Sequence, residues 1–316
     1  MERKAAIEME EITKVAILGA GAMGAFFASR FADQPDFVTC LIAEGDRAEI
    51  LRKNGLVVNG KSYFITVVEP TKSPAPVDMI LVALKHHQLT AAISNLAPLV
   101  GDDTIFLSVM NGLESESILA SQFGSDKVLY AISVGIDAVR EENCITYTKA
   151  GKHIFGETKN LTLSQKVLRV QKALNKAGIQ YETPEDMLRM LWWKFMVNVG
   201  VNQASAVLRA PYGIFHKDKD AQALMESLMK EVVALAQASD INLTLQDVEN
   251  WYPVLHTLSP EGKTSMLQDV EAGRPTEVDV FGEKVVELGK KFNIPTPVNQ
   301  TIVHMIRVIE RHVPSS

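Results

Sequence analysis

Three polar side chains, Lys194, Asn198 and Asn202, stand four residues apart in a stretch of the chain that is apolar over most of its length. The stretch, residues 187–208, has one glycine and no proline and is longer than a strand, so it predicts a buried helix. At about 100° per residue, each step of four drifts by only about 40°, which puts the three groups on one stripe. An ammonium and two amides are costly on an apolar helix unless they are paired. The stripe is therefore a satisfied buried network, a helix edge facing water, or a site for an oxygen-rich ligand.

A glycine-rich motif follows directly on a short β-branched run, residues 13–18, and precedes a segment with helical spacing. Its first glycine allows a tight turn, its second lets backbone N–H groups approach a pyrophosphate, and its third lets the helix pack against the strand. A ligand-free βα turn is the alternative, but the strand–turn–helix context favours dinucleotide binding. The motif consists of Gly19, Ala20, Gly21, Ala22, Met23 and Gly24.

An acidic residue, Glu44, stands 20 positions after the last glycine of the motif, past a second predicted strand at residues 36–42. A carboxylate there can accept hydrogen bonds from both ribose hydroxyls and repels a 2′-phosphate, which favours NAD(H). Arg47, three residues on, could instead reach a phosphate. A solvated loop carboxylate is the alternative interpretation of Glu44.

Two more polar residues follow predicted buried strands. Lys85 comes just after the strand at 77–84, and Asn111 follows the strand at 104–109. Ligands of open α/β sheets sit at the carboxyl ends of the strands. An Asn before a Gly at such an end is a turn by default, but Asn111 is also placed to hydrogen-bond a nicotinamide amide.

Strand signals stop near residues 178–183, and helical patterns take over. We therefore predict an α/β protein with a Rossmann-type dinucleotide-binding domain at 1–180 and an all-helical substrate domain at 181–316. The helical patterns after the first one run through 219–239, 245–258, 265–271, 278–292 and 299–311.

Composition excludes several other functions. A length of 316 residues allows two domains, and 47% hydrophobic with 22% charged residues is ordinary for a globular protein. A net charge of −6 with no basic block argues against nucleic acid or an anionic membrane as partner. No apolar run is long enough to span a membrane, and the charged N-terminus lacks a signal-peptide core. The two cysteines lack metal-site spacing. We expect a metal-free cytoplasmic protein.

Two later segments complete the pattern: residues 264–269, TSMLQD, and 274–277, RPTE. Together with the glycine motif, Lys85, the NGL at 111–113 and the polar stripe, they resemble the ketopantoate reductase (2-dehydropantoate 2-reductase) family from Lys14 to about Arg311. The resemblance implies a 6-phosphogluconate dehydrogenase-like fold whose cleft holds cofactor and substrate. It also implies reduction of 2-ketopantoate to D-pantoate, a step toward pantothenate and coenzyme A, usually with NADPH, by a monomer or homodimer.

The resemblance also implies a role for each polar residue. Lys194 would be the general acid, since hydride delivery builds negative charge on the keto oxygen that an ammonium can stabilise and protonate. Burial would lower its pKa, while Glu277, which would help to place Lys194 and the substrate, would raise it, so the net direction stays open. The predicted substrate ligands are Asn198 and Asn202 for hydroxyl and carbonyl oxygens and Ser265 for the carboxylate. Lys85 and Asn111 would contact cofactor and substrate at the nicotinamide end, Lys85 as a cofactor-binding residue and Asn111 as both.

Two positions depart from the family pattern. Glu44 stands where many members have an arginine for the 2′-phosphate, and Tyr212 stands roughly where some have a substrate-contacting asparagine. We expect NADP(H), with NAD(H) left open by Glu44. The substrate is ketopantoate or another branched 2-oxo acid, because methyl-sized pocket differences are worth only about 1–3 kcal/mol. A non-catalytic nucleotide sensor is a third alternative, but a sensor needs neither Lys194 nor Glu277.

Overall fold

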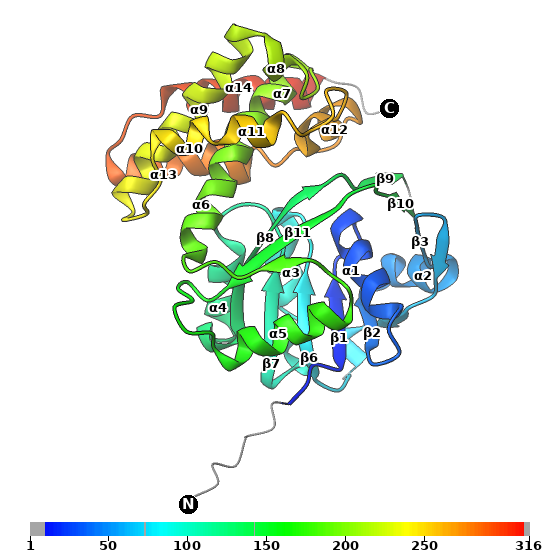
Figure 1. Ribbon diagram of the computed structural model, residues 1–316. Coiled ribbons are helices and arrows are strands. Elements are labelled where there is room, and N and C mark those ends of the chain that lie inside the picture. The colour runs from blue at the N-terminus through cyan, green and yellow to red at the C-terminus, as the bar shows by residue number, and fades with distance from the viewer. Residues whose placement is uncertain (1–9, 73, 142, 313–316) are drawn as a thin grey trace, which may run out of the picture. The chain divides into compact units, whose positions relative to one another are not determined.

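The computed structural model describes residues 10–72, 74–141 and 143–312 (Figure 1). The chain forms two compact units. The first comprises Met1–Met110 and Glu114–Met187, and the second comprises Asn111–Leu113 and Leu188–Ser316. The division by contacts thus falls after Met187, somewhat beyond the boundary expected after residue 180, and it assigns a three-residue segment from the middle of the first unit to the second.

An eight-stranded sheet forms the centre of the first unit, in the order β12-β11-β8-β7-β6-β1-β2-β5. The strands from β5 to β8 are parallel, β11 runs antiparallel to β8, and β12 is parallel to β11. This is the doubly wound order of dinucleotide-binding folds, with β1 beside the point where the winding reverses. The predicted Rossmann-type domain is confirmed. The strands are β1 (Lys14–Leu18), β2 (Val38–Ile42), β5 (Thr66–Val68), β6 (Val77–Val82), β7 (Val100–Ser108), β8 (Val128–Ile136), β11 (Ala150–Gly156) and β12 (Tyr181–Glu182).

Helices cover both faces of this sheet because successive strand residues point to opposite sides. Val15 and Ile17 of β1 belong to the core that includes α1 and α5, while Ala16 and Leu18 belong to the core that includes α3 and α4. Strands buried on both faces explain the continuous apolar runs in the sequence. The helices of this unit are α1 (Ala22–Ala32), α2 (Gly45–Asn54), α3 (His86–Ile93), α4 (Ser115–Phe123) and α5 (Gln165–Lys176).

A second, four-stranded sheet has the order β4-β3-β10-β9. Asn59 and Gly60 have φ of 47° and 79° and turn β3 back onto antiparallel β4, as a tight hairpin requires. Residues 66–68 do not continue that hairpin; they pair with β2 in the large sheet as β5. The strands of the small sheet are β3 (Leu56–Val58), β4 (Lys61–Tyr63), β9 (Val139–Glu141) and β10 (Cys144–Thr146).

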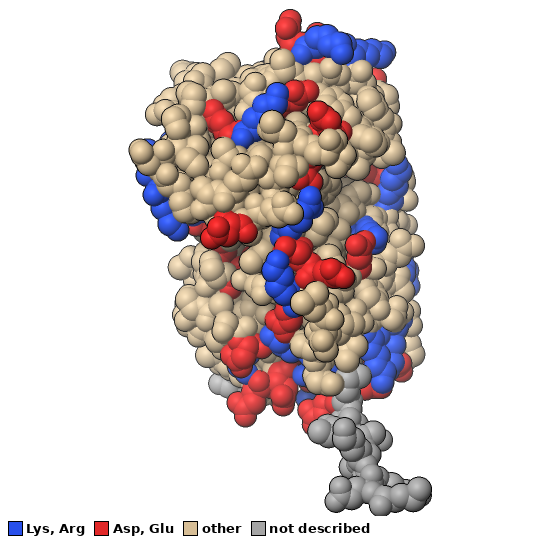
Figure 2. All heavy atoms as spheres, turned by 60° about the vertical axis from the view of Figure 1, so that its left-hand side comes forward, with Lys and Arg blue, Asp and Glu red and all other residues tan. Residues whose placement is uncertain are grey.

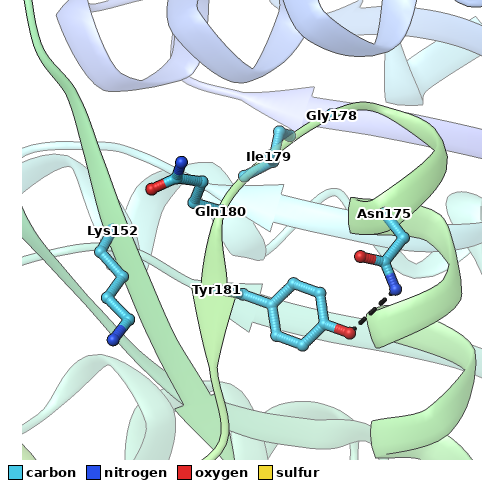
Figure 3. A pocket seen from close by; sticks show the side chains of 6 residues that line it. All are labelled: Lys152, Asn175, Gly178, Ile179, Gln180 and Tyr181. Carbon is cyan, nitrogen blue, oxygen red and sulfur yellow. Dashed lines mark hydrogen bonds between the residues drawn. The ribbon is translucent and has the colours of Figure 1, made fainter.

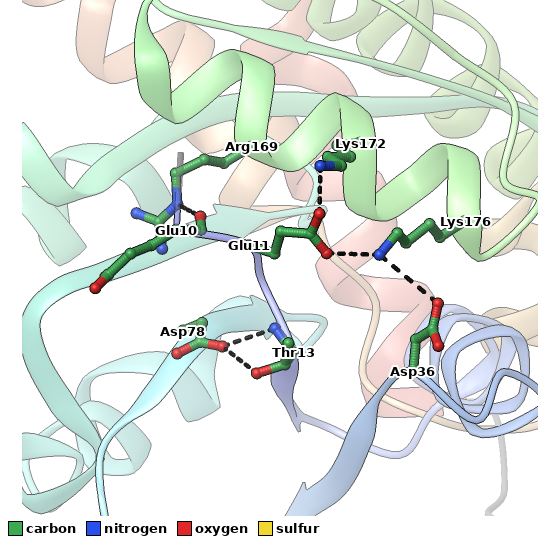
Figure 4. Close-up of polar contacts among 8 residues, drawn as sticks. All are labelled: Glu10, Glu11, Thr13, Asp36, Asp78, Arg169, Lys172 and Lys176. Atoms are coloured by element: carbon green, nitrogen blue, oxygen red, sulfur yellow. Dashed lines mark hydrogen bonds and ion pairs between the residues drawn. The ribbon is translucent and has the colours of Figure 1, made fainter. Parts of the chain in front are cut away.

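Ion pairs fasten the chain just before β1 to helix α5 (Figure 4). Glu11 accepts hydrogen bonds from Lys172 and, at 2.6 Å, from Lys176, and Lys176 also lies 3.6 Å from Asp36. The Lys172 ammonium, followed by that of Lys176, lowers the pKa of Glu11 from 4.5 to about 2. Because the folded-state pKa lies below the unfolded value, the carboxylate stabilises the fold above about pH 4.5, and this contribution is lost as pH falls toward 2.

We therefore expect Glu11→Gln to lower the urea midpoint of unfolding at about pH 7, with a difference from wild type that narrows as the pH is lowered toward 3. Glu49→Gln, which removes an exposed acid on α2, is the matched control and should leave the midpoint unchanged at both pH values. A difference that grows on acidification would contradict the assignment.

The second unit is helical, as predicted, and is built around one apolar core. Helix α9 contacts α7, α8, α10, α13 and α14. The predicted helix at 245–258 is divided at Asn250 into two short helices. The helices are α6 (Met187–Val197), α7 (Gln203–Leu208), α8 (Ile214–Lys217), α9 (Lys219–Ala238), α10 (Leu245–Glu249), α11 (Trp251–Leu255), α12 (Ser265–Glu271), α13 (Lys284–Phe292) and α14 (Pro297–His312).

Two π-helical turns, η4 (Asn198–Asn202) and η5 (Asp279–Glu283), interrupt what the sequence predicts as regular helices. In η4, Gly200 lets α9 approach closely, since a Cβ there would lie 2.5 Å from Met229. The Gln203 side chain donates to the Val199 carbonyl at 2.9 Å and so satisfies a backbone acceptor of the turn. π-turns occur often at functional sites, and this one carries both asparagines of the polar stripe.

Figure 2 shows one face of the molecule, on which acidic and basic side chains are intermingled, in keeping with the modest net charge of −6. Within the described part of the chain, no helix combines the length and the apolar character that crossing a bilayer requires.

Candidate active site

A continuous line of hydrogen bonds joins five of the predicted site residues in the second unit. Asn111 donates to Glu277 at 2.9 Å and accepts from Asn198 at 3.2 Å. Asn202 donates to the Asn198 side-chain oxygen at 3.2 Å, and Ser265 donates to that of Asn202 at 3.1 Å. Every bond in the line donates in the direction of the Glu277 carboxylate. The structure thus brings together residues that lie up to 166 positions apart in the chain.

Some N–H groups of this line of side chains donate no hydrogen bond within it. Each side-chain amide has two N–H bonds, and within the described residues Asn111, Asn198 and Asn202 each direct a single hydrogen bond of this group at a neighbour. Their amide oxygens are already engaged. Asn198 and Asn202 are only 4% and 6% exposed, so they have little contact with water. Groups with spare N–H and occupied oxygens suit a ligand rich in oxygen acceptors.

Lys194 lies on α6, one turn before Asn198, and is half-buried. Burial lowers the pKa of its ammonium from 10.5 to about 8. Across the described residues its ammonium makes no hydrogen bond or ion pair, with Glu277 or with any other side chain. The two opposing influences expected from the sequence are therefore resolved: desolvation decides the direction, which is the one that eases proton donation near neutral pH.

Glycine at position 112 lets Asn111 reach this group. Gly112 has φ of +98°, and a Cβ there would lie 2.5 Å from the Cγ1 of Val280 in η5. A side chain at this position would thus meet both a strained backbone and a packed neighbour. The short segment Asn111–Leu113 packs with the second unit for this reason, with Leu113 against its apolar core.

In the first unit, the glycine motif forms the turn between β1 and α1. Gly19 has φ of +103°, and a Cβ on Gly24 would lie 1.7 Å from the Gly19 carbonyl oxygen. Both glycines are therefore required by the turn itself. Gly21 differs, because a Cβ there meets nothing within 4 Å. Open space before a glycine at a helix N-terminus fits the approach of a pyrophosphate to backbone N–H groups.

Glu44 comes directly before helix α2, and Arg47 lies in the first turn of that helix. Glu44 is the N-cap residue and is exposed, with Asn95 donating to it at 3.4 Å. Arg47 donates to the carbonyl of Ala20, within the glycine turn, at 3.2 Å. Burial, and then the nearby Arg140, lower the pKa of the Arg47 guanidinium from its ordinary value. A guanidinium thus lies against the turn expected to hold the dinucleotide.

Lys85 is the N-cap residue of α3, at the carboxyl end of β6. It belongs to the first unit, whereas Asn111, its predicted partner at the nicotinamide end, is grouped with the second.

Glu116, which the sequence did not single out, is a buried acid. Ser115 donates to it at 2.8 Å and lies 2.7 Å from Ser108, and burial raises the pKa of Glu116 from 4.5 to about 7. A glutamate in the first turn of a helix is typical of dipole complementation, so the sequence carries no signal of its burial.

A surface hollow of about 580 Å³ in the first unit contains none of the predicted residues (Figure 3). Asn175 in its wall donates to Tyr181 at 3.0 Å, and the nearby Lys152 pairs with Glu182. The amide of Asn175 and the ammonium of Lys152 are thus engaged with the protein. The hollow is lined by Lys152, Asn175, Gly178, Ile179, Gln180 and Tyr181.

Comparison with known proteins covers nearly the whole chain. The family model described as ketopantoate reductase PanE/ApbA matches residues 15–160, and the one for the C-terminal part of that family matches residues 186–310. The chain is 27% identical to a 2-dehydropantoate 2-reductase from Mesorhizobium japonicum, over 93% of this chain and 97% of the relative.

Solved structures share the fold. D-mandelate dehydrogenase in complex with NADH and anilino(oxo)acetate superposes with a TM-score of 0.85 at 21% identity, covering 95% of this chain and 99% of that one. A dimeric ketopantoate reductase from Staphylococcus aureus gives a TM-score of 0.76 at 22% identity, over 94% and 99% of the two chains.

Proposed function

Because the chain belongs to the ketopantoate reductase family, we propose that it reduces 2-ketopantoate to D-pantoate with Lys194 as the general acid. It is an oxidoreductase that uses a nicotinamide cofactor and acts on a small keto acid. The observation that carries the assignment is the hydrogen-bonded line from Glu277 to Ser265. Lys194 lies one turn before Asn198, a member of this line, on helix α6.

The reaction needs a hydride, a proton and a fixed carbonyl. A nicotinamide cofactor held at the glycine turn would supply the hydride for the keto carbon. The Lys194 ammonium stabilises the charge that develops on the keto oxygen and then donates a proton to it. A pKa near 8 keeps the ammonium mostly protonated at neutral pH while making it a better acid than an exposed lysine.

The line of amides orients the substrate. Asn198 and Asn202 direct their spare N–H groups at hydroxyl and carbonyl oxygens. Ser265 binds the carboxylate by turning its single O–H from the Asn202 oxygen to the substrate. Glu277 holds the Asn111 side chain through the 2.9 Å bond and so fixes which way its amide points. Substrate held in one geometry reacts faster because the loss of orientational freedom precedes the chemical step.

We assign the cofactor as NADP(H). The contact of Arg47 with the Ala20 carbonyl supports this choice, since it keeps a guanidinium beside the glycine turn. Glu44 opposes it, because an exposed carboxylate at this position suits a ribose diol better than a phosphate.

Glu44→Arg tests this balance. It should raise the ratio of kcat/KM for NADPH to that for NADH by roughly tenfold to a hundredfold, since it removes a repulsion and adds a charge-assisted hydrogen bond. Asp46→Arg, at an exposed position of the same helix, is the control for a general charge effect. An unchanged ratio in Glu44→Arg, or an equal change in both variants, would show that Glu44 does not face the ribose.

The function itself is tested by steady-state oxidation of NADPH and of NADH with ketopantoate, followed at the nicotinamide absorbance. Rapid turnover with ketopantoate supports the proposal. Tight dinucleotide binding without turnover on any 2-oxo acid would instead indicate a nucleotide sensor.

A second candidate is an NADH-dependent reductase of another branched 2-oxo acid. Glu44 favours NADH, because its carboxylate suits a free ribose diol. Tyr212 favours a different substrate, because a half-buried phenol stands where the family pattern has an amide. Burial raises the pKa of that phenol to about 12, so Tyr212 stays neutral. The steady-state assay is therefore repeated with 2-oxo acids that have larger branches and with the keto acid that corresponds to mandelate.

A further inference from the structure

The C-terminal helix α14 holds the short segment that carries Glu277. Glu310 of α14 accepts two hydrogen bonds from Thr276, from its backbone N–H at 2.8 Å and from its hydroxyl at 2.7 Å, both on the same carboxylate oxygen. The Thr276 hydroxyl in turn accepts from the N–H of Val278 at 3.2 Å. The residues immediately before and after Glu277 are thus tied, directly or through one hydroxyl, to a single carboxylate.

Arg307, one turn earlier on α14, holds the other end of the segment. Its guanidinium lies 2.8 Å from Asp279 and 3.0 Å from Glu283, the first and last residues of η5. Glu310 adds to the field that raises the pKa of Arg307, although Asp279 is the main cause. One face of α14 therefore contacts the segment on both sides of Glu277.

Glu277 itself faces away from solvent, being 8% exposed, and receives the Asn111 amide. Its side chain can hold that amide in one orientation only if its own backbone is fixed. The Glu277 carbonyl accepts from the N–H groups of Val280 and Phe281, at 3.0 and 3.1 Å, and so begins the helical turn. The N–H of Thr276 lies before these bonds, where a helix start offers no backbone acceptor, and Glu310 accepts from it instead.

We propose that Glu310 is a positioning residue for the reaction, acting through Thr276 on the backbone of Glu277 and hence on Asn111. This inference rests on the proposed function, because it assigns Glu277 a task in substrate binding. Glu310 does not contact the substrate; its carboxylate serves as a fixed acceptor outside the line of amides.

Three variants separate this role from a general effect on the fold. Glu310→Ala removes the acceptor, and Glu310→Gln keeps one side-chain oxygen that can accept both bonds from Thr276. Glu287→Ala removes an exposed carboxylate of α13 that pairs with Lys284 and is the matched control. We expect kcat/KM for the 2-oxo acid to fall roughly tenfold in Glu310→Ala, and to stay near the wild-type value in Glu310→Gln and Glu287→Ala.

Two readouts distinguish positioning from destabilisation. The amides of Thr276 and Val278 should exchange hydrogen roughly tenfold faster in Glu310→Ala, while exchange in α9 stays unchanged. In a Glu277→Ala background, Glu310→Ala should cause little further loss of kcat/KM, because the contact with Asn111 on which Glu310 acts is already absent. Equal losses in the two backgrounds, unchanged exchange at Thr276, or wild-type kcat/KM in Glu310→Ala would each overturn the inference.

Failure of the proposed function has a different signature. If the wild-type protein reduces no 2-oxo acid, the assignment of the reaction fails. The exchange experiment then decides by itself whether Glu310 fixes the Glu277 backbone: faster exchange at Thr276 supports this, and unchanged exchange refutes it.

Discussion

Lys194→Ala is expected to lower kcat for 2-oxo acid reduction by about 10²–10⁴-fold while leaving dinucleotide affinity unchanged. Removal of the ammonium takes away both the proton donor and the charge that stabilises the developing oxyanion. Dinucleotide binding depends on the glycine turn of the other unit and should persist. The measurements are single-turnover kinetics and titration of NADPH by nicotinamide fluorescence. Lys290→Ala, at an exposed lysine of α13, is the control and should behave as wild type.

The pH dependence gives an independent test of the same residue. Only the protonated ammonium can donate, and burial sets its pKa at about 8. We therefore expect kcat to be level at lower pH and to fall about tenfold per pH unit above 8. Lys194→Arg should remove this alkaline fall, because guanidinium stays protonated throughout. Normal turnover in Lys194→Ala, or an alkaline fall that survives in Lys194→Arg, would show that another group is the acid.

Gly24→Ala is expected to abolish measurable dinucleotide binding and to lower the melting temperature. The added methyl group would lie 1.7 Å from the Gly19 carbonyl oxygen, so the turn and the start of α1 must move apart. Overpacking of this kind typically costs about 1–3 kcal/mol of stability, and it displaces the backbone N–H groups that are expected to hold the pyrophosphate.

Gly21→Ala is the matched comparison within the same motif. A Cβ there meets no protein atom within 4 Å, so the melting temperature should stay at the wild-type value. Dinucleotide affinity should nevertheless fall, roughly tenfold or more, since the methyl group would occupy space that the pyrophosphate needs. Thermal unfolding and NADPH titration of both variants check these outcomes. Equal affinity of Gly21→Ala and wild type would mean that the dinucleotide does not approach Gly21.

Local sequence was enough to predict the framework of both units. The glycine motif after a β-branched run identified the β1–α1 turn, because only glycine fits its backbone angles and close contacts. The helical pattern predicted at 265–271 coincides with α12, Ser265–Glu271. The structure adds its cap, since Thr264 accepts from the Leu267 N–H at 3.1 Å. These features depend on neighbours within a few residues.

The spacing of the polar stripe was also readable from sequence, but its geometry was not. A step of four predicts that Asn198 and Asn202 are neighbours on an α-helix, and their side chains are indeed hydrogen-bonded. The backbone that joins them is a π-turn, which depends on the close approach of α9 at Gly200 and on the Gln203 side chain. Packing partners from distant segments decided this, and no local pattern encodes them.

The tertiary structure alone decided which groups meet and what their charges do. Asn111 and Glu277 are 166 residues apart, and their bond forms because Gly112 packs against Val280. The sequence left the direction of the Lys194 pKa shift open, because burial and a nearby carboxylate act oppositely. Burial prevails: desolvation lowers the pKa of Lys194 to about 8, while the Glu277 carboxylate accepts from Asn111. Sequence thus determined which groups are available for chemistry. Long-range packing determined the partners and the protonation of these groups. Partners and protonation depend on distances between segments, and spacing along the chain does not fix those distances.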